Sequence, residues 1–249
     1  MGMDPHTIHY LAERTIPRSL LRGSFISSLR GYYLVIPILD GHSPDEDTIF
    51  VSVKAEADTI YAYLRNEGID ELEFIDGLSL GAIIAFEVYR RREIRIKRVF
   101  SDGGPFFSFG RGMKGFMRVA FGAPIKHPRL FGAIIRRKFP YSNSGVDIAI
   151  DVCRHMKAES IRSLASACYS FMFPKLSEEA QREMTFLYGE VEPANKSMPE
   201  LQAHYPTARF LTIPGCHHCE YMSTNVHEYA RILMSGAPIT LGNRDTPGH

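Results

Sequence analysis

The chain has 249 residues, of which 45% are hydrophobic and 23% are charged. This length accommodates one sizeable buried core and is short for two separate domains. The 29 basic and 28 acidic residues leave a formal charge of +1, so the molecule as a whole has no field that attracts nucleic acid or an anionic membrane. We therefore expect one main domain whose partner is a small molecule.

The sequence contains no apolar run of about 18 residues or more, and its first residues lack the basic start and apolar stretch of a secretory signal. Its four cysteines are too few for a disulfide scaffold in a chain of this size. These features predict a cytoplasmic protein without a membrane span.

Strand-like and helix-like segments alternate through the first hundred residues. Strands are expected where short β-branched and aromatic runs occur, and helices where apolar residues recur at three- and four-residue steps. In chain order the expected elements are a strand at 7–11, a helix at 19–29, a strand at 32–37, a helix at 51–66, a strand at 72–76, a helix at 80–91 and a strand at 96–100. This alternation predicts an α/β fold with a mostly parallel sheet that is covered on both faces.

The alternation stops between residues 106 and 182 and then resumes. That interval is too long for an ordinary loop, so we expect it to have helices of its own. It is followed by a strand at 184–188, a helix at 196–204, a strand at 208–213 and a helix at 226–234. The predicted organisation is a core of 1–105 and 183–235, a helical insertion of 106–182, and a disordered tail of 236–249.

A Gly-x-Ser-x-Gly segment, Gly77-Leu78-Ser79-Leu80-Gly81, lies between a predicted strand and a predicted helix. This context is typical of a nucleophile elbow, in which the glycines leave room for a sharp turn beside a strained serine. We therefore interpret Ser79 as a nucleophile, with the Leu80 amide at the helix start as an oxyanion donor.

A serine hydroxyl needs a histidine base, usually oriented by an acid. An acidic segment, Gly189-Glu190-Val191-Glu192-Pro193, follows the strand at 184–188, and His217 and His218 follow the strand at 208–213. Serine, acid and histidine thus occur in the chain order expected for a hydrolase of this architecture.

These motifs resemble the α/β-hydrolase superfamily from about Thr7 to Met234, including its helical lid, which corresponds to 106–182. The resemblance implies that Glu192 is the acid and His218 the base. The segment Pro37-Ile38-Leu39-Asp40-Gly41-His42 matches a further family loop. Glu190 or Asp102, which ends a strand, could supply the acid instead, and His217 could replace His218.

The Cys216-x-x-Cys219 spacing around these histidines could in principle bind zinc. A structural zinc site needs four ligands, and no second such cluster occurs in the sequence. A redox motif is expected earlier in the chain. We expect neither a metal nor a cofactor.

The sequence departs from the family pattern in two places. The first two of the usual eight strands are missing, which predicts a sheet of about six strands whose edge is the strand near Tyr32; we expect a homodimer or a terminal segment to cover it. The family's His-Gly oxyanion segment is replaced by Ala12-Glu13-Arg14, where the Glu13 amide could still donate because a backbone amide needs no particular side chain.

The sequence therefore predicts a serine hydrolase that cleaves an ester, thioester or amide through an acyl-enzyme on Ser79. An acyltransferase and a non-catalytic binding protein on the same scaffold are the alternatives.

The insertion's aromatic and methionine residues indicate a partly apolar pocket or the insertion's own core: Phe106, Phe107, Phe109, Phe116, Met117, Phe121, Phe131, Phe171, Met172 and Phe173. Its arginines, Arg111, Arg118, Arg136 and Arg137, could attract an acidic group or solvate the surface.

Overall fold

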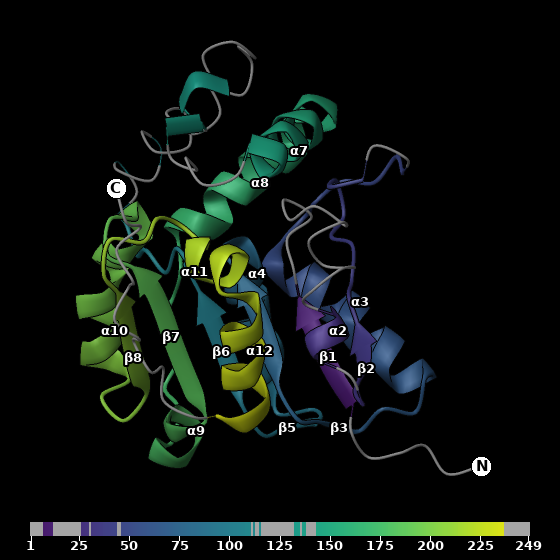
Figure 1. The fold of residues 1–249 in the computed structure, drawn as a ribbon. Coiled ribbons are helices and arrows are strands. Elements are labelled where there is room, and N and C mark those ends of the chain that lie inside the picture. Colours follow the sequence, from purple (N-terminus) through teal and green to yellow (C-terminus); the bar gives the residue numbers. More distant parts are fainter. Residues whose placement is uncertain are drawn as a thin grey trace.

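The computed structural model describes residues 7–11, 26–29, 31–43, 46–110, 112, 115, 132–134, 136–137 and 143–236. Within these residues the main sheet has six strands, all parallel, in the order β2-β1-β4-β6-β7-β8 (Figure 1). The strands are β1 Thr7–Leu11, β2 Tyr33–Val35, β4 Ile75–Leu78, β6 Val99–Asp102, β7 Met184–Gly189 and β8 Arg209–Ile213. The predicted parallel sheet of about six strands is confirmed.

Two predicted strands, 72–76 and 96–100, are each broken into two pieces. The first pieces, β3 (Glu71–Leu72) and β5 (Arg95–Ile96), pair with each other in a separate two-stranded sheet. In a continuous strand Leu72 and Phe74 would face the same side, but Leu72 packs in the core on one face of the sheet and Phe74 in the core on the other. The chain must break between them to bury both side chains.

Helices cover both faces of the sheet, and each face has its own apolar core. Figure 1 shows α12 in front of the central strands and α4 behind them. One core includes residues of α3 (Val53–Asn66), α4 (Leu80–Arg91), α8 (Ala158–Tyr169) and α10 (Met198–His204). The other includes residues of α11 (Glu220–Thr224) and α12 (Val226–Ser235), and α2 (Ile26–Ser28) contacts α12.

Most helices lie where the sequence predicts them. The predicted helix at 51–66 begins at Val53, because the Ser52 hydroxyl accepts a hydrogen bond from the Ala55 amide (3.1 Å) and caps it. Helix α11 and the short 3₁₀ helix η2 (Pro193–Ser197) were not expected. Of the helix expected at 19–29, only α2 falls within the described residues, and of the tail at 236–249 only Gly236 does.

Strand β2 is at the edge of the sheet and pairs with β1 alone among the described strands. This confirms the predicted edge near Tyr32. Four of the large apolar side chains that are exposed in the described part of the chain lie on β2, on the loops beside it or on α3: Tyr33 (55% exposed), Ile38, Val51 (64%) and Tyr63.

The expected lid segment includes α7 (Asn143–His155), α8 and α9 (Glu178–Arg182). Figure 1 shows α7 and α8 beyond the carboxyl ends of the central strands. Helix α8 is attached to the core through Ser160, whose hydroxyl accepts a hydrogen bond from the buried Phe50 amide (3.1 Å). None of the described helices combines the length and the apolar character that a membrane crossing requires.

Candidate active site

Ser79 occupies the turn between β4 and α4 in a strained backbone conformation, with φ 53° and ψ −118°. A residue other than glycine rarely adopts this backbone conformation unless the surrounding structure enforces it. Gly77 makes the turn feasible, because a Cβ atom there would lie 2.2 Å from the carbonyl oxygen of Gly81. The Ser79 amide donates to the carbonyl oxygen of Asp102 on the neighbouring strand (2.8 Å). These features are those of a nucleophile elbow.

Of the two predicted oxyanion donors, the structure describes only Leu80. Leu80 is the first residue of α4, so its N–H group has no acceptor within the helix and lies at the positive end of the helix dipole. Glu13, with its neighbours Ala12 and Arg14, lies outside the described residues.

The predicted acid and base contact each other. The Nδ1 atom of His218 is hydrogen-bonded to Oε2 of Glu192, and the other carboxyl oxygen accepts the Gly189 amide (2.6 Å). The Glu192 side chain has no exposed area, whereas that of His218 is 18% exposed. A buried carboxylate needs such donors to remain ionised. Glu192 is therefore placed to fix the orientation of the imidazole, which still reaches solvent.

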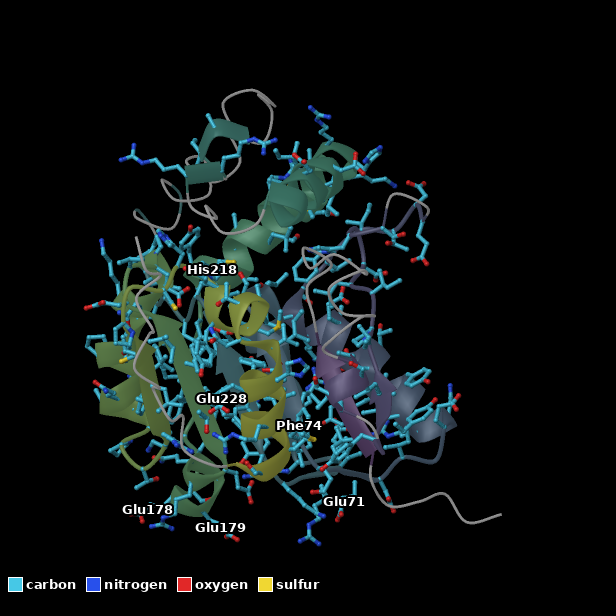
Figure 2. The ribbon with its side chains drawn as sticks, viewed as in Figure 1. Glu71, Phe74, Glu178, Glu179, His218 and Glu228 are labelled. Atoms are coloured by element: carbon cyan, nitrogen blue, oxygen red, sulfur yellow. The ribbon has the colours of Figure 1, made fainter. Side chains whose placement is uncertain are left out.

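Gly103 connects this pair to the nucleophile elbow. It follows Asp102, whose carbonyl oxygen accepts the Ser79 amide, and it has φ +64°. A Cβ atom at this position would lie 2.7 Å from Cε1 and Nδ1 of His218 and 2.9 Å from Oε2 of Glu192. Figure 2 shows His218 at the α11 end of the sheet, whereas Glu71, Glu178 and Glu179 lie at the opposite end.

The alternative candidates lie in other surroundings. Glu190 accepts the Gly215 amide with its carboxylate (2.8 Å), and the His217 amide donates to Glu220 (2.7 Å). Asp102 is buried at the end of β6. His42, in the loop that matches the family segment, is buried and its Nδ1 atom lies 3.0 Å from the Asp40 carbonyl oxygen.

The cysteines that flank His218 lie against the core rather than around a common centre. Cys216 is buried in the core on the α12 face, and the thiol of Cys219 donates to the Asp102 carbonyl oxygen (3.7 Å). No cluster of His, Cys, Asp and Glu side chains suited to a metal ion occurs among the described residues.

The aromatic residues of the insertion divide into two groups. Phe106 and Phe171 are buried in the core beside α4, and Phe173 packs against them. Phe107, Phe109 and Tyr169 are half-buried, with nearly parallel rings whose centroids lie 5.2 to 6.1 Å apart. Six further residues that the sequence singles out lie outside the described residues: Phe116, Met117, Phe121, Phe131, Arg111 and Arg118. Arg136 pairs with Asp147.

Sequence reasoning missed three contributors to this site: Gly103, Asp76 and Tyr229. Only the position of Gly103, directly after a strand that ends in Asp102, could have indicated it. The Tyr229 hydroxyl donates to Oδ1 of Asp76 (3.0 Å), and both side chains are buried. These residues are 153 positions apart, so no local pattern connects them.

No protein-family model and no curated protein matches the sequence. Solved structures do match its fold. A protein from Desulfitobacterium hafniense that is described as a member of the α/β hydrolase family has a TM-score of 0.68 at 19% identity, with 94% of this chain and 96% of the other covered. An esterase from Thermogutta terrifontis has a TM-score of 0.65 at 13% identity, with 92% and 91% covered.

The RedJ thioesterase of the prodiginine pathway in Streptomyces coelicolor has a TM-score of 0.61 at 18% identity, covering 92% of this chain and 83% of its own. At these identities the likeness concerns the arrangement of strands and helices. The chain therefore has the α/β-hydrolase fold.

Proposed function

We propose that this protein is a serine hydrolase that cleaves an ester or thioester through an acyl-enzyme on Ser79. One observation carries the proposal: Ser79 has the positive φ of a nucleophile elbow, and its amide is bonded to Asp102, whose neighbour Gly103 lies against the Glu192–His218 pair. Strain of this kind is costly and persists where the surrounding structure enforces it, which is typical of functional sites. The solved structures of similar fold include an esterase and a thioesterase.

The proposed reaction follows from the roles of these three residues. Glu192 holds Nδ1 of His218, so Nε2 takes the proton of the Ser79 hydroxyl as its oxygen attacks the substrate carbonyl. The Leu80 amide donates to the oxyanion. His218 then protonates the leaving group as its bond to the acyl carbon breaks. Water attacks the acyl-enzyme as His218 takes its proton, and His218 returns that proton to the Ser79 oxygen when the acid is released. Glu192 stabilises the imidazolium that forms in both steps.

Three aromatic side chains support a substrate with an apolar portion. Phe107, Phe109 and Tyr169 present nearly parallel rings, and Phe107 lies four residues after Gly103, which contacts the catalytic histidine. Half-buried rings of this kind stabilise apolar or planar groups that cover them. We propose that this aromatic cluster contacts the acyl or alcohol group of a small ester or thioester.

Labelling with a fluorophosphonate probe tests the proposal, because the probe reacts with activated serines. The wild-type protein is compared with Ser79→Ala and His218→Ala, and with Ser101→Ala as a matched control at a buried serine of the adjacent strand. We expect labelling of the wild type and of Ser101→Ala and none of the other two variants. A folded wild-type protein that is not labelled would contradict the proposal and favour a ligand-binding protein.

Hydrolysis of p-nitrophenyl esters of increasing acyl length then tests the apolar portion. We expect kcat/KM to rise with chain length and to fall roughly tenfold in Phe109→Ala for the longer esters, because apolar contact area is lost. An acyl donor that turns over only when a second nucleophile is added would identify an acyltransferase instead.

A further inference from the structure

Two carboxyl groups lie buried beside the proposed triad and have no part in the reaction above. They belong to Asp76 on β4 and Asp102 at the end of β6, which are 0% and 1% exposed. In the register of these strands Asp76 pairs with Phe100 and Leu78 with Asp102. Because side chains alternate along a strand, Asp76 and Asp102 point to the same face, which is the face that α12 covers.

The hydrogen bonds are unequally distributed among the three carboxyl groups of this region. Glu192 accepts the Gly189 amide and contacts His218. Asp76 accepts the Tyr229 hydroxyl. Both carboxyl oxygens of Asp102 are shielded from solvent and have no donor of their own in the described part of the chain, because the nearby Tyr229 hydroxyl donates to Asp76. An ionised carboxylate without donors is the most costly group that a protein can bury.

The groups that surround Asp102 also oppose a charge on it. Burial raises the pKa of Asp102 well above its usual value, the negative charges of Glu192 and Asp76 raise it further, and the Tyr229 hydroxyl of α12 lowers it. Burial likewise raises the pKa of Asp76, to about 8. The loop before α11 contributes His218, which faces Glu192, and Cys219, which contacts the Asp102 carbonyl oxygen. Two neighbouring carboxylates seldom both ionise in such a site.

The main chain of Asp102 and Gly103 together meets all three parts of the proposed triad. Its carbonyl oxygen accepts the amide of Ser79, and the next residue, Gly103, lies against the His218 ring and the Glu192 carboxylate. A charge on the Asp102 side chain would therefore act on the nucleophile, the base and the acid together.

We propose that Asp102 is a positioning residue that acts on the triad through Glu192: it remains a neutral carboxylic acid, so that Glu192 alone carries the negative charge beside His218. This inference rests on the proposed function, because it concerns the base that activates Ser79. A second carboxylate would favour the imidazolium form of His218, and a histidine that already holds a proton cannot take one from Ser79.

Infrared spectroscopy tests the protonation state without requiring activity. The wild type, Asp102→Asn and Asp76→Asn are each prepared with aspartate that carries ¹³C in its carboxyl group, and their infrared spectra are compared at neutral pH. The label separates the carboxyl bands of aspartate from those of glutamate. We expect a protonated aspartic acid band in the wild type that persists in Asp76→Asn and loses intensity in Asp102→Asn. Absence of that band from Asp76→Asn would overturn the proposal, even if Asp102→Asn does not fold.

The pH profile of kcat/KM tests the effect on His218. In Asp102→Asn we expect the acid limb to stay within about 0.3 pH units of the wild type, because an amide has the same charge as a neutral acid. A decrease of about one unit or more would show that a neighbouring negative charge had been removed and would overturn the proposal. Failure of fluorophosphonate labelling would refute the hydrolase function and leave the infrared result intact, so the two failures are distinguishable.

Discussion

At the residue scale, the site depends on a few positions where backbone conformation and close packing coincide. Ser79 and Gly103 both have positive φ, and Gly77 and Gly103 leave space that a Cβ atom would occupy. The residues of the proposed triad were predicted from their motifs, whereas Gly103 required the structure. The difference arises because the space beside Gly103 is filled by a histidine more than a hundred residues further along the chain.

Gly103→Ala tests this packing. We expect kcat/KM to fall roughly 100-fold, because a methyl group there would displace the His218 ring and small displacements of a catalytic group have effects of that size. The matched control is Gly68→Ala, since Gly68 has a similar φ of +67° and nothing within 4 Å of its Cβ position. Both variants should lose roughly 1 to 2 kcal/mol of stability from backbone strain.

Chemical denaturation and ester hydrolysis separate these two effects. Equal activity in Gly103→Ala and Gly68→Ala would show that His218 is not held against Gly103, and would remove the steric part of the argument for the site.

At the element scale, the broken strands show where sequence periodicity misled the prediction. The run at 72–76 is interrupted because Leu72 and Phe74 pack on opposite faces of the sheet, and the run at 96–100 because Ile96 and Phe100 do so. The resulting strands β4 and β6 extend two residues beyond the predicted ends, to Leu78 and Asp102. Asp102 is therefore part of a strand, in register with Leu78 beside the nucleophile elbow.

Helix α8 offers a test at the same scale. Ser160→Ala removes the acceptor of the buried Phe50 amide, and an unsatisfied buried N–H group costs roughly 1 to 3 kcal/mol. We expect a loss of that size in the free energy of unfolding, measured in urea. Ser163→Ala, at a half-buried position of the same helix, should change it by less than about 0.5 kcal/mol. Equal effects of the two substitutions would mean that Ser160 does not attach α8 to the core.

At the scale of the whole molecule, the edge strand β2 has no partner strand on one side among the strands that the structure describes. The exposed Tyr33 lies on this strand, the exposed Tyr63 is hydrogen-bonded to Tyr33, and the exposed Val51 precedes α3. The sequence predicts a homodimer or a covering terminal segment at this edge, and that remains a prediction. A second copy is well suited to it, because two identical edge strands can pair antiparallel about a twofold axis.

Light scattering coupled to size-exclusion chromatography measures the predicted assembly. We expect a dimeric mass for the wild type and a shift toward the monomer in Tyr33→Asp/Val51→Asp, because the charges would be buried at the interface. Met172→Asp is the control, since Met172 is 84% exposed and belongs to the insertion. A monomeric wild type would contradict the dimer and leave the covering segment as the alternative.

The sequence by itself determined the α/β class, the parallel sheet of six strands, the edge position of the second strand and the fold family, because periodicity and turn residues are local signals. The contact between Glu192 and His218, predicted from the resemblance, became visible only in the tertiary structure. The structure alone decided where the strands break, which core each aromatic residue enters and that Asp76, Asp102 and Tyr229 gather beside the Glu192–His218 pair. Those features depend on contacts between residues far apart in the chain, and no local pattern encodes them.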